Sequence, residues 1–323
     1  MHTRAASPGE RIVFHPDDPV RDVELLGLSS ESLWPISVTV HLTDRCNHSC
    51  NWCWFSRSDA ELEISKVIDT LSDFVAMGAR EIIVSGGGEP LLHPDVDNLL
   101  YYLVSQHRVH RRLYTNGSLL NRHRLVEDAF DYVRVSLDAG GEELHSRLHG
   151  TCRGSYRRIL ASLSEMAARK RSLLVGVSVV VTTFNIDSLK QLTQDCRSFS
   201  VSYALFKPLM RGLIRESAPV VPETEPGMSV FARCPLSAST QTLPSLPEAF
   251  ASKCLTIAPD SCVYPCCHLS GDKYLISQIG DVSERIGSKR HRAALRSYAG
   301  APHSCRIHDL WTSSLYGEKV APL

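Results

Sequence analysis

Three cysteines on one short stretch constrain this chain more than any other feature. Cys46, Cys50 and Cys53 are separated by three and two residues, in a run that reads DRCNHSCNWCW. Three thiolates at this spacing can hold three irons of a four-iron cluster and leave the fourth iron open to a substrate or cofactor. A structural zinc site would need a fourth ligand nearby, and the next cysteine in the chain is Cys152. The stretch therefore favours an iron–sulfur site with an open position, and a zinc site is the alternative.

This spacing, with the aromatic Trp52 just before the third cysteine, resembles the signature of the radical S-adenosylmethionine (radical SAM) superfamily. The resemblance implies that SAM chelates the open iron of a [4Fe-4S] cluster and is cleaved by an electron from it to a 5'-deoxyadenosyl radical. It also implies an external one-electron reductant such as flavodoxin or ferredoxin. Trp52 is expected to pack against the cluster, to approach the adenine of SAM, or simply to fill the core.

The charge balance of the chain argues against a polyanionic partner. Lys plus Arg and Asp plus Glu each number 35 among 323 residues, so no net charge favours nucleic acid or an anionic membrane. The N-terminus lacks the apolar core of a secretory signal, and no apolar run approaches the roughly 20 residues that span a bilayer. We therefore expect a cytoplasmic protein that acts on a small molecule or a peptide, with no nucleic-acid or membrane partner.

Strands alternate with helices over the first two thirds of the chain. Strand patterns recur at residues 37–42, 81–85, 112–114, 132–138, 173–181 and 201–206. Helical patterns lie at 64–75, at 95–106 and around 159–166; Gly78 can end the first, and Asn185 can cap a later helix. Six such units predict an α/β fold with a parallel sheet, and they agree with the partial (β/α)6 TIM-like barrel that the resemblance implies.

We expect three regions along the chain. Residues 1–35 form an N-terminal arm, residues 36–210 the radical SAM partial barrel, and residues 211–323 a linker followed by a second, cysteine-rich module. Six of the 11 cysteines lie in the last third of the chain. In a reducing compartment such cysteines favour metal binding or catalysis over disulfides.

Loops that follow the predicted strands carry the candidate SAM-binding residues, because ligands of α/β folds bind at the carboxyl ends of strands. The second strand opens into Gly86-Gly87-Gly88-Glu89-Pro90, which looks like the family's glycine-glycine-glutamate-proline motif. Glycines let a ligand approach the backbone, and the carboxylate of Glu89 can accept a ligand ammonium. The resemblance implies that this segment binds the amino group of SAM. A tight turn before a helix is the structural alternative.

Polar residues after the third and fourth strands complete this set. Ser136 and Asp138 should leave the fourth strand on the same face, where a hydroxyl and a carboxylate suit the two hydroxyls of a ribose. Asn116 and Arg147, expected in loops, are weaker candidates for the ribose and the SAM carboxylate. Without a ligand these residues would serve as caps, turns or solvated surface.

The C-terminal stretch from Lys253 looks like the start of the auxiliary-cluster modules called SPASM and twitch domains. Cys254 precedes a hairpin in which Ser261 replaces the usual turn glycine, and Cys266 follows a Val-Tyr-Pro segment. The short ending favours a twitch-like α+β module with one auxiliary [4Fe-4S] cluster. The expected ligands are Cys254, Cys266 and Cys305, then Cys234, with His308, Cys262 or Cys267 as a fourth ligand. Zinc is the alternative metal.

Neighbouring Cys266 and Cys267 cannot both point at one cluster from a strand, so one of them, or Cys262, should be free. We expect Cys262 or Cys267 to be able to donate a hydrogen atom to a substrate radical, and an inert buried cysteine is the alternative.

These observations predict a radical SAM oxidoreductase that dehydrogenates or cross-links a small polar metabolite or a peptide, in natural-product tailoring. Only about 35 residues precede the barrel, which favours small metabolites. An auxiliary cluster that accepts an electron would give net oxidation, whereas hydrogen return by a cysteine would give epimerisation. A radical SAM epimerase is therefore one alternative, and a non-catalytic iron–sulfur or zinc-binding protein is another.

Overall fold

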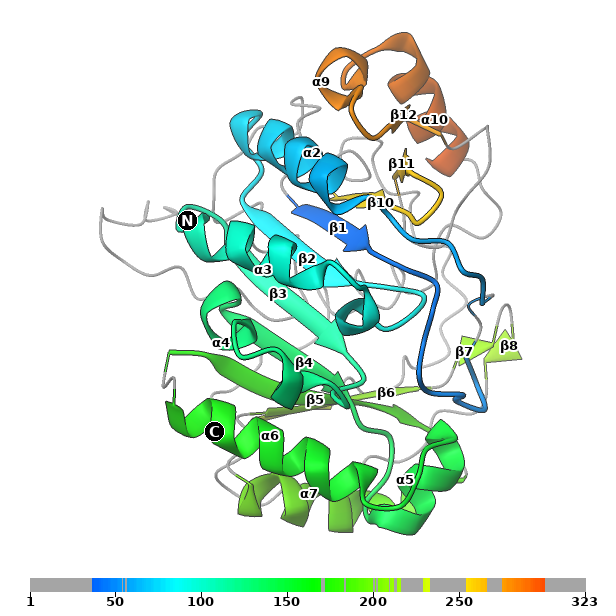
Figure 1. The fold of residues 1–323 in the computed structure, drawn as a ribbon. Coiled ribbons are helices and arrows are strands. Elements are labelled where there is room, and N and C mark those ends of the chain that lie inside the picture. The colour runs from blue at the N-terminus through cyan, green and yellow to red at the C-terminus, as the bar shows by residue number, and fades with distance from the viewer. Residues whose placement is uncertain are drawn as a thin grey trace, which may run out of the picture.

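The computed structural model describes residues 37–53, 55, 57–169, 172–182, 184–199, 201, 203–208, 210–211, 214–215, 229–232, 254–265 and 275–299. A mixed ten-stranded sheet in the order β12-β11-β10-β1-β2-β3-β4-β5-β6-β9 forms its centre (Figure 1). The predicted arm over residues 1–35 lies outside the described residues.

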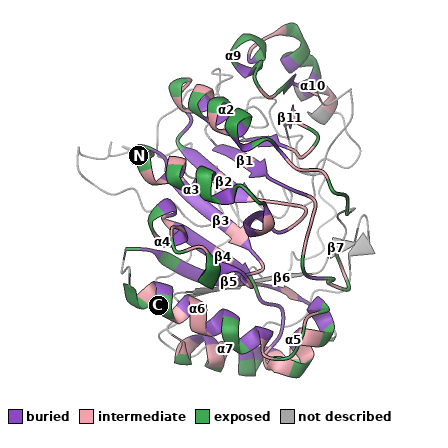
Figure 2. Ribbon diagram, viewed as in Figure 1, coloured by how far each residue is buried: buried purple, intermediate pink, exposed green. Residues whose placement is uncertain are grey.

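The six predicted strands are all present and lie side by side in chain order. They are β1 (Ser37–His41), β2 (Glu81–Ser85), β3 (His110–Thr115), β4 (Tyr132–Ser136), β5 (Leu174–Val181) and β6 (Tyr203–Pro208). Each neighbouring pair among them is parallel. The valines of β1 and β4 are buried, and so are Val175, Val177, Val179 and Val181 of β5, which places these strands in the core (Figure 2). The prediction of an α/β fold with a mostly parallel sheet is confirmed.

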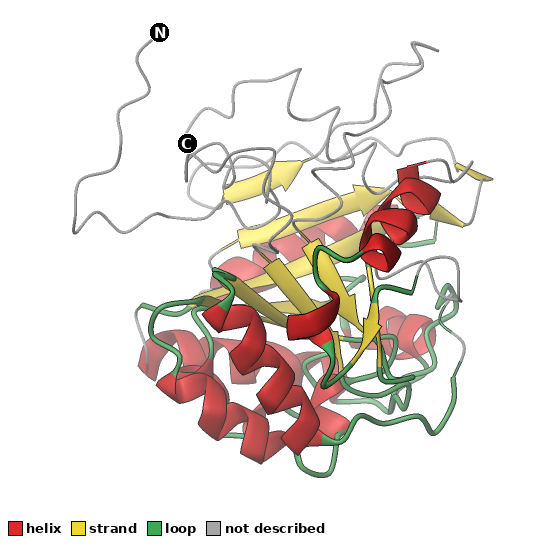
Figure 3. Ribbon diagram, turned by 90° about the horizontal axis from the view of Figure 1, so that it is seen from above, coloured by secondary structure: helices red, strands yellow, loops and turns green. Residues whose placement is uncertain are grey.

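Amphipathic helices connect these strands and lie along the outside of the sheet (Figures 1 and 3). They are α2 (Ile64–Ala76), α3 (Val96–Ser105), α4 (Val126–Ala129), α5 (Glu142–His149), α6 (Ser155–Arg169) and α7 (Leu189–Ser198), with single turns η1 (Pro90–Leu92), η2 (Leu120–Arg122) and η3 (Ile186–Ser188). Gly78 follows α2 with φ +108°, a conformation that favours glycine and ends the helix.

A buried ionic network joins the amino-terminal ends of β1, β2 and β3. Nε of Arg112 lies 2.6 Å from Oε1 of Glu81, and both side chains are less than a tenth exposed. The hydroxyl of Ser37 donates a hydrogen bond of 2.7 Å to Oε2 of the same glutamate. Because a buried charge is stable only when it is paired, these contacts specify which strands lie next to one another.

The C-terminal segment adds to the same sheet. β10 (Cys254–Ile257) pairs in parallel with β1, and β11 (Cys262–Tyr264) and β12 (Ser277–Gln278) continue the sheet in antiparallel pairs. The predicted hairpin is thus confirmed, and Ser261 in its turn has φ +63°. Ser261 is the one residue other than glycine with a positive φ among the described parts of the chain, which is the strain expected where serine replaces a turn glycine.

Further elements lie in and after the predicted linker. β9 (Ser229–Ala232) lies within the stretch predicted as a linker and pairs in parallel with β6. β7 (Met210–Arg211) and β8 (Ile214–Arg215) form a small separate hairpin. After β12, α9 (Val282–Arg285) and α10 (Lys289–Ala299) end the described chain, and Gly280 donates a backbone hydrogen bond of 3.2 Å to Thr70 of α2. Within the described ranges, no helix is long and apolar enough to cross a membrane.

Candidate functional site

The three front cysteines lie on the loop between β1 and α2, at the carboxyl edge of the parallel sheet. Cys46 and Cys50 are half-buried, Cys53 is exposed, and all three are free thiols. Burial raises the pKa of the Cys46 thiol, although the backbone N–H of His48 donates to its sulfur. Thiolates are the preferred ligands of iron–sulfur clusters, so the donor set of this loop fits a [4Fe-4S] cluster bound through three cysteines.

The glycine-rich loop after β2 packs directly against the cysteine loop. The backbone N–H of Gly88 donates to the carbonyl of Thr43 at 3.1 Å, and the N–H of Glu89 donates to the carbonyl of Arg45 at 2.8 Å. A Cβ atom on Gly88 would lie only 2.1 Å from the Arg45 carbonyl oxygen. Gly88 is therefore required for the approach of two backbones, a role that the sequence alone did not assign to it.

The carboxylate of Glu89 faces inward and is 1% exposed. Oε1 accepts from the Thr115 hydroxyl at 2.6 Å and from the Leu91 N–H at 3.1 Å. Oε2 accepts from the N–H of Asn116 at 2.7 Å. Burial raises the pKa of Glu89 even though all three hydrogen bonds oppose the shift. Protein donors thus reach both oxygens, two at Oε1 and one at Oε2, and Pro90 begins η1 just after the glutamate.

Asn116 lies beside the cysteine loop, as its position after β3 predicted. Its Nδ2 donates to Oδ1 of Asn47 at 2.8 Å and is 3.9 Å from the sulfur of Cys46. Its Oδ1 accepts from the hydroxyl of Ser118 at 2.6 Å. A small polar network of amides and a hydroxyl therefore borders the first cysteine, where it could contact a polar ligand.

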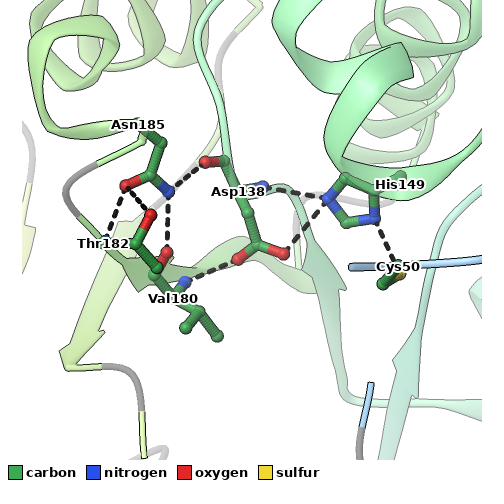
Figure 4. Close-up of polar contacts among 6 residues, drawn as sticks. All are labelled: Cys50, Asp138, His149, Val180, Thr182 and Asn185. Atoms are coloured by element: carbon green, nitrogen blue, oxygen red, sulfur yellow. Dashed lines mark hydrogen bonds and ion pairs between the residues drawn. The ribbon is translucent and has the colours of Figure 1, made fainter. Parts of the chain in front are cut away.

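Ser136 and Asp138 do not present one common surface. Ser136 is exposed, whereas Asp138 is 3% exposed and its carboxylate points into the protein (Figure 4). Oδ1 of Asp138 accepts from the N–H of Val180 at 2.5 Å, and its Oδ2 lies 3.1 Å from Nε2 of His149. The expectation that both side chains leave β4 on one face is wrong, because Asp138 lies beyond the end of that strand and turns toward α5.

Asn185 holds this region together and does not cap a helix with its side chain. Its Nδ2 donates to the carbonyls of Asp138 at 2.5 Å and of Val180 at 2.7 Å, and its Oδ1 accepts from the N–H of Thr182 at 2.7 Å (Figure 4). The side chain is fully buried, so its amide replaces the backbone partners that the ends of β4 and β5 lack.

His149 is the residue of this site that the sequence analysis missed. Its Nδ1 lies 3.3 Å from the sulfur of Cys50, and its side chain is 1% exposed. Burial alone would lower the pKa of His149, but its hydrogen bonds to Asp138 and Cys50 outweigh burial and raise the pKa to about 10. The ring is therefore protonated near neutral pH and forms an ion pair with Asp138.

The helix that carries His149 also corrects the placement of Arg147. Both residues lie on α5, where a loop was expected, and Arg147 is exposed while His145 and His149 are buried. Two histidines four residues apart occupy one face of a helix. That spacing, after the glycines at the start of α5, is the sequence signal that could have identified them.

Three buried histidines, His48 of the cysteine loop and His145 and His149 of α5, form a cluster. The rings of His145 and His149 stack with centroids 4.4 Å apart, and His48 meets His149 edge-on at 5.5 Å. Trp52 also approaches His149 edge-on, at 6.2 Å. Burial, with the charge of His149, lowers the pKa of His48 to about 4 and that of His145 to about 3, so both are neutral at pH 7. Both ring nitrogens of His48 and His145 lack hydrogen-bond partners in the described structure.

His48, Cys50 and His149 also offer a set of ligands for a single metal ion, because one ligand atom from each lies within 4.8 Å of the other two. Neither His48 nor His149 was predicted as a metal ligand from the sequence.

Two of the C-terminal cysteines, Cys254 and Cys262, belong to described strands, and they lie at opposite edges of the sheet. Cys254 opens β10 and pairs with Ser37, at the amino edge opposite the cysteine loop. Cys262 opens β11 at the carboxyl edge, where its carbonyl accepts from the N–H of Ala258, and burial raises the pKa of its thiol. Cys234, Cys266, Cys267, Cys305 and His308, and the side chain of Cys254, lie outside the described structure.

Comparison with protein families identifies one domain in this chain. Residues 40–196 match the Radical SAM superfamily. That range starts within β1 and ends within α7, and it contains the cysteine loop, the glycine loop and α5.

Three curated relatives each match about half of the chain. The chain is 31% identical over 166 residues to pre-heme d1 synthase of Dinoroseobacter shibae, which covers 48% of the chain and 39% of the relative. It is 31% identical over 163 residues to the mycofactocin maturase MftC of Mycobacterium tuberculosis, covering 49% of the chain and 40% of MftC. It is 30% identical over 183 residues to a probable GTP 3',8-cyclase of Methanocella arvoryzae, covering 55% of the chain and 56% of the cyclase. The chain thus spans only about two fifths to just over half the length of these relatives.

Solved structures show the same fold. anSMEcpe with bound AdoMet aligns with a TM-score of 0.58 at 14% identity, over 82% of this chain and 83% of anSMEcpe. SuiB of Streptococcus suis, bound to its precursor peptide SuiA, aligns with a TM-score of 0.56 at 11% identity, over 93% of this chain and 70% of SuiB.

Proposed function

We propose, from the radical SAM domain that residues 40–196 form, that this chain is a radical SAM enzyme that oxidises a peptide or a small polar molecule. Such a domain implies a [4Fe-4S] cluster and SAM, and Cys46, Cys50 and Cys53 would hold the cluster. When bound, the cluster supplies the electron that cleaves SAM and so produces a radical able to abstract hydrogen from the substrate.

One observation carries this proposal: the loop with three free cysteines lies at the carboxyl edge of a parallel sheet and is hydrogen-bonded to the glycine loop on one side and to α5 on the other. Backbone hydrogen bonds to Thr43 and Arg45 hold it on one side. Bonds from Ser49 and Asn51 to the end of α5 hold it on the other. Backbone contacts thus hold the stretch from Thr43 to Asn51, which carries Cys46 and Cys50, at the edge where α/β folds bind their ligands.

The residues around this loop suggest how SAM would be held. The backbone of Gly86 and Gly87, with the amides and hydroxyl of Asn47, Asn116 and Ser118, would contact its polar groups, and Ser136 is an exposed hydroxyl for the ribose. Glu89 and Asp138 would act indirectly, because their carboxylates already bind protein donors. Arg147 and Trp52 stay candidates for the SAM carboxylate and the adenine.

The strand order supports a partial barrel for residues 36–210. Parallel strands that follow one another in chain order, with right-handed crossovers, place every crossover helix on the same side of the sheet. Curvature of such a sheet would enclose the cysteine loop and exclude water from the radical.

The substrate class is supported from two sides. MftC is a maturase and SuiB has been solved with a precursor peptide, so the shared fold can accept a peptide. A GTP 3',8-cyclase among the relatives shows that the domain also occurs in an enzyme with a nucleotide substrate. We give the peptide precedence, in contrast to the preference for small metabolites that the sequence suggested.

An auxiliary cluster in a SPASM- or twitch-like module would make the net reaction an oxidation. Cys254 would be one of its ligands, at the sheet edge opposite the front cluster, with Cys266, Cys305 and Cys234 as further candidates. Cys262 lies at the carboxyl edge of the sheet, the edge that also carries the front loop, and is a candidate hydrogen donor for the alternative reaction, epimerisation.

The test uses the full chain, reconstituted and reduced without oxygen and incubated with SAM. We expect 5'-deoxyadenosine, detected by mass spectrometry, and none from Cys50→Ala. Cys152→Ala is the matched control, because Cys152 is an exposed thiol outside the loop, and it should retain cleavage. Absence of 5'-deoxyadenosine from a protein that contains four irons would overturn the proposal.

A second candidate function, binding of one zinc ion, is favoured by the ligand set of His48, Cys50 and His149. Metal analysis of the chain purified without oxygen separates the two. One zinc and no iron, with zinc lost in His48→Ala, would support this candidate, whereas about four or eight irons support one or two clusters.

A further inference from the structure

The end of α5 is fixed to the middle of the cysteine loop. The N–H groups of Ser49 and Asn51 donate to the carbonyls of His149 and Leu148, at 2.8 Å and 3.0 Å, and Cys50 lies between these two donors. Gly150 allows this approach, because it has φ +60° and a Cβ there would lie 2.0 Å from the hydroxyl of Ser49. The distance between His149 and Cys50 is therefore set by backbone contacts on both sides of the cysteine.

The side chain of His149 is oriented from its other end by Asp138. Oδ2 of Asp138 lies 3.1 Å from Nε2, nearer than the backbone nitrogen of Asp138 at 3.4 Å. The carboxylate is itself held by the N–H of Val180. The ring can then rotate little, and Nδ1 points at the sulfur of Cys50, 3.3 Å away (Figure 4).

A cysteine that is bound to iron is a thiolate and has no proton to donate. The Cys50 sulfur and the Asp138 carboxylate are then both hydrogen-bond acceptors, so the contacts at 3.3 Å and 3.1 Å each require a hydrogen on the ring, with Nδ1–H facing the sulfur and Nε2–H facing the carboxylate. A carboxylate that accepts a hydrogen bond from a histidine ring fixes the orientation of that ring, as it does for histidines around metal sites.

We propose that His149 is a positioning residue that donates its Nδ1–H to the Cys50 sulfur and thereby raises the reduction potential of the front cluster. This inference rests on the proposed function. A donated hydrogen bond stabilises the reduced cluster more than the oxidised one, because the reduced cluster places more negative charge on its sulfurs, and such bonds are among the determinants of cluster potential. His149 would in this way help a reductant of moderate potential to supply the electron.

The experiment is a potentiometric titration of the reconstituted full chain, with the reduced cluster measured by electron paramagnetic resonance. At the potential where half of the wild-type cluster is reduced, we expect the ratio of reduced to oxidised cluster in His149→Phe to fall about tenfold, the size expected for loss of one hydrogen bond to a charged group. His149→Gln, whose amide can still donate, should recover most of this ratio.

His145→Phe is the matched control, since His145 lies in the same buried cluster but makes no hydrogen bond to Cys50 among the described contacts. It should leave the ratio unchanged. An equal fall in His145→Phe and His149→Phe, or an unchanged ratio in His149→Phe, would overturn the inference. If His149→Phe takes up no iron, Asp138→Asn tests the proposal in its place. It should lower the ratio of reduced to oxidised cluster, because it weakens the orientation of His149. An unchanged ratio in Asp138→Asn would refute the proposal.

A second readout is specific to the hydrogen bond. In deuterated water, electron–nuclear double resonance of the reduced wild-type cluster should show a coupled exchangeable deuteron that is missing in His149→Phe. A wild-type protein that binds no cluster at all would instead overturn the proposed function, so the two failures are distinguishable.

Discussion

The carboxylate of Glu89 accepts a hydrogen bond from the hydroxyl of Thr115, with 2.6 Å between Oε1 and Oγ1. Because Glu89 follows the glycine loop and Thr115 ends β3, this contact joins two neighbouring loops at the carboxyl edge. The glutamate thus holds the glycine loop against the end of β3, beside the cysteine loop.

Glu89→Gln should lower the free energy of unfolding by about 1–3 kcal/mol, because the amide nitrogen would face a protein donor and leave a buried group unsatisfied. Denaturant unfolding measures this loss. Glu143→Gln, an exposed change on α5, is the control and should have little effect. Equal stability of Glu89→Gln and the wild type would show that the three donors do not depend on a carboxylate.

Gly88→Ala should disturb the cysteine loop, because its Cβ would lie 2.1 Å from the Arg45 carbonyl oxygen. We expect a loss of about 1–3 kcal/mol in stability, as for other overpacked sites, and a lower iron content after reconstitution. Gly87→Ala should be milder, because its Cβ would meet side chains and no backbone, with the ring of Phe55 at 2.8 Å and Oδ1 of Asp44 at 3.3 Å. Iron content that is equal in the two variants would contradict this ranking.

Glu81→Gln should lower the free energy of unfolding by about 3–5 kcal/mol near pH 7, because it leaves the buried Arg112 without its counter-charge. Burial would raise the pKa of Glu81, but Arg112, His110 and Ser37 hold it below its usual value. The stabilisation is therefore present at neutral pH. It is lost as the pH falls below about 4.3, the pKa of an unperturbed glutamate, toward the lower pKa that Glu81 has in the folded protein.

Denaturant unfolding at several pH values checks this prediction. The difference between the wild type and Glu81→Gln should shrink on acidification. The exposed pair of Glu63 and Lys66 offers the control, and Glu63→Gln should change stability little at any pH. A difference for Glu81→Gln that stays constant down to pH 3 would rule out the ion pair as its source.

Cys254→Ala should lower the iron content to about half while the yield of 5'-deoxyadenosine per remaining front cluster is retained, because two four-iron clusters would become one. Cys50→Ala should lose the iron of the front cluster, which is the other half of the total, and should no longer cleave SAM. Iron analysis with quantitative mass spectrometry measures both. An iron content that Cys254→Ala leaves unchanged would argue against an auxiliary cluster bound by this residue.

Oxidation and epimerisation differ in the fate of the substrate carbon. Once a peptide or metabolite is found that increases 5'-deoxyadenosine formation, the reaction in deuterated water should leave no deuterium at the attacked carbon if the product is oxidised. Incorporation that disappears in Cys262→Ala would instead identify an epimerase with this cysteine as the donor. Mass spectrometry of the product distinguishes these outcomes.

The regular part of the fold could be predicted because its signals are local. β2 coincides with its predicted run from Glu81 to Ser85, and α3 lies between the predicted ends Asp95 and Gln106. Apolar periodicity and the cysteine spacing each depend on a few consecutive residues, so both are readable without knowledge of the tertiary structure.

The contacts that shape the site were not predictable in the same way. Asp138 and Glu89 look like ligand-binding carboxylates in the sequence, and only the positions of His149 and Thr115 show that they bind protein donors. β9 and the parallel pairing of β10 with β1 also join segments far apart in the chain. Such pairings depend on tertiary packing, which local propensity does not encode.

The parallel pairing of β10 with β1 has a consequence for the integrity of the whole chain. Without residues 254–257, β1 would become the last strand of the sheet and expose a row of unpaired backbone groups, the kind of surface that promotes aggregation. The strand that leads into Cys46 is therefore shielded by a segment more than 200 residues away in the sequence. Truncating the carboxyl terminus would endanger the solubility of the amino-terminal half as well as removing the distal cysteines.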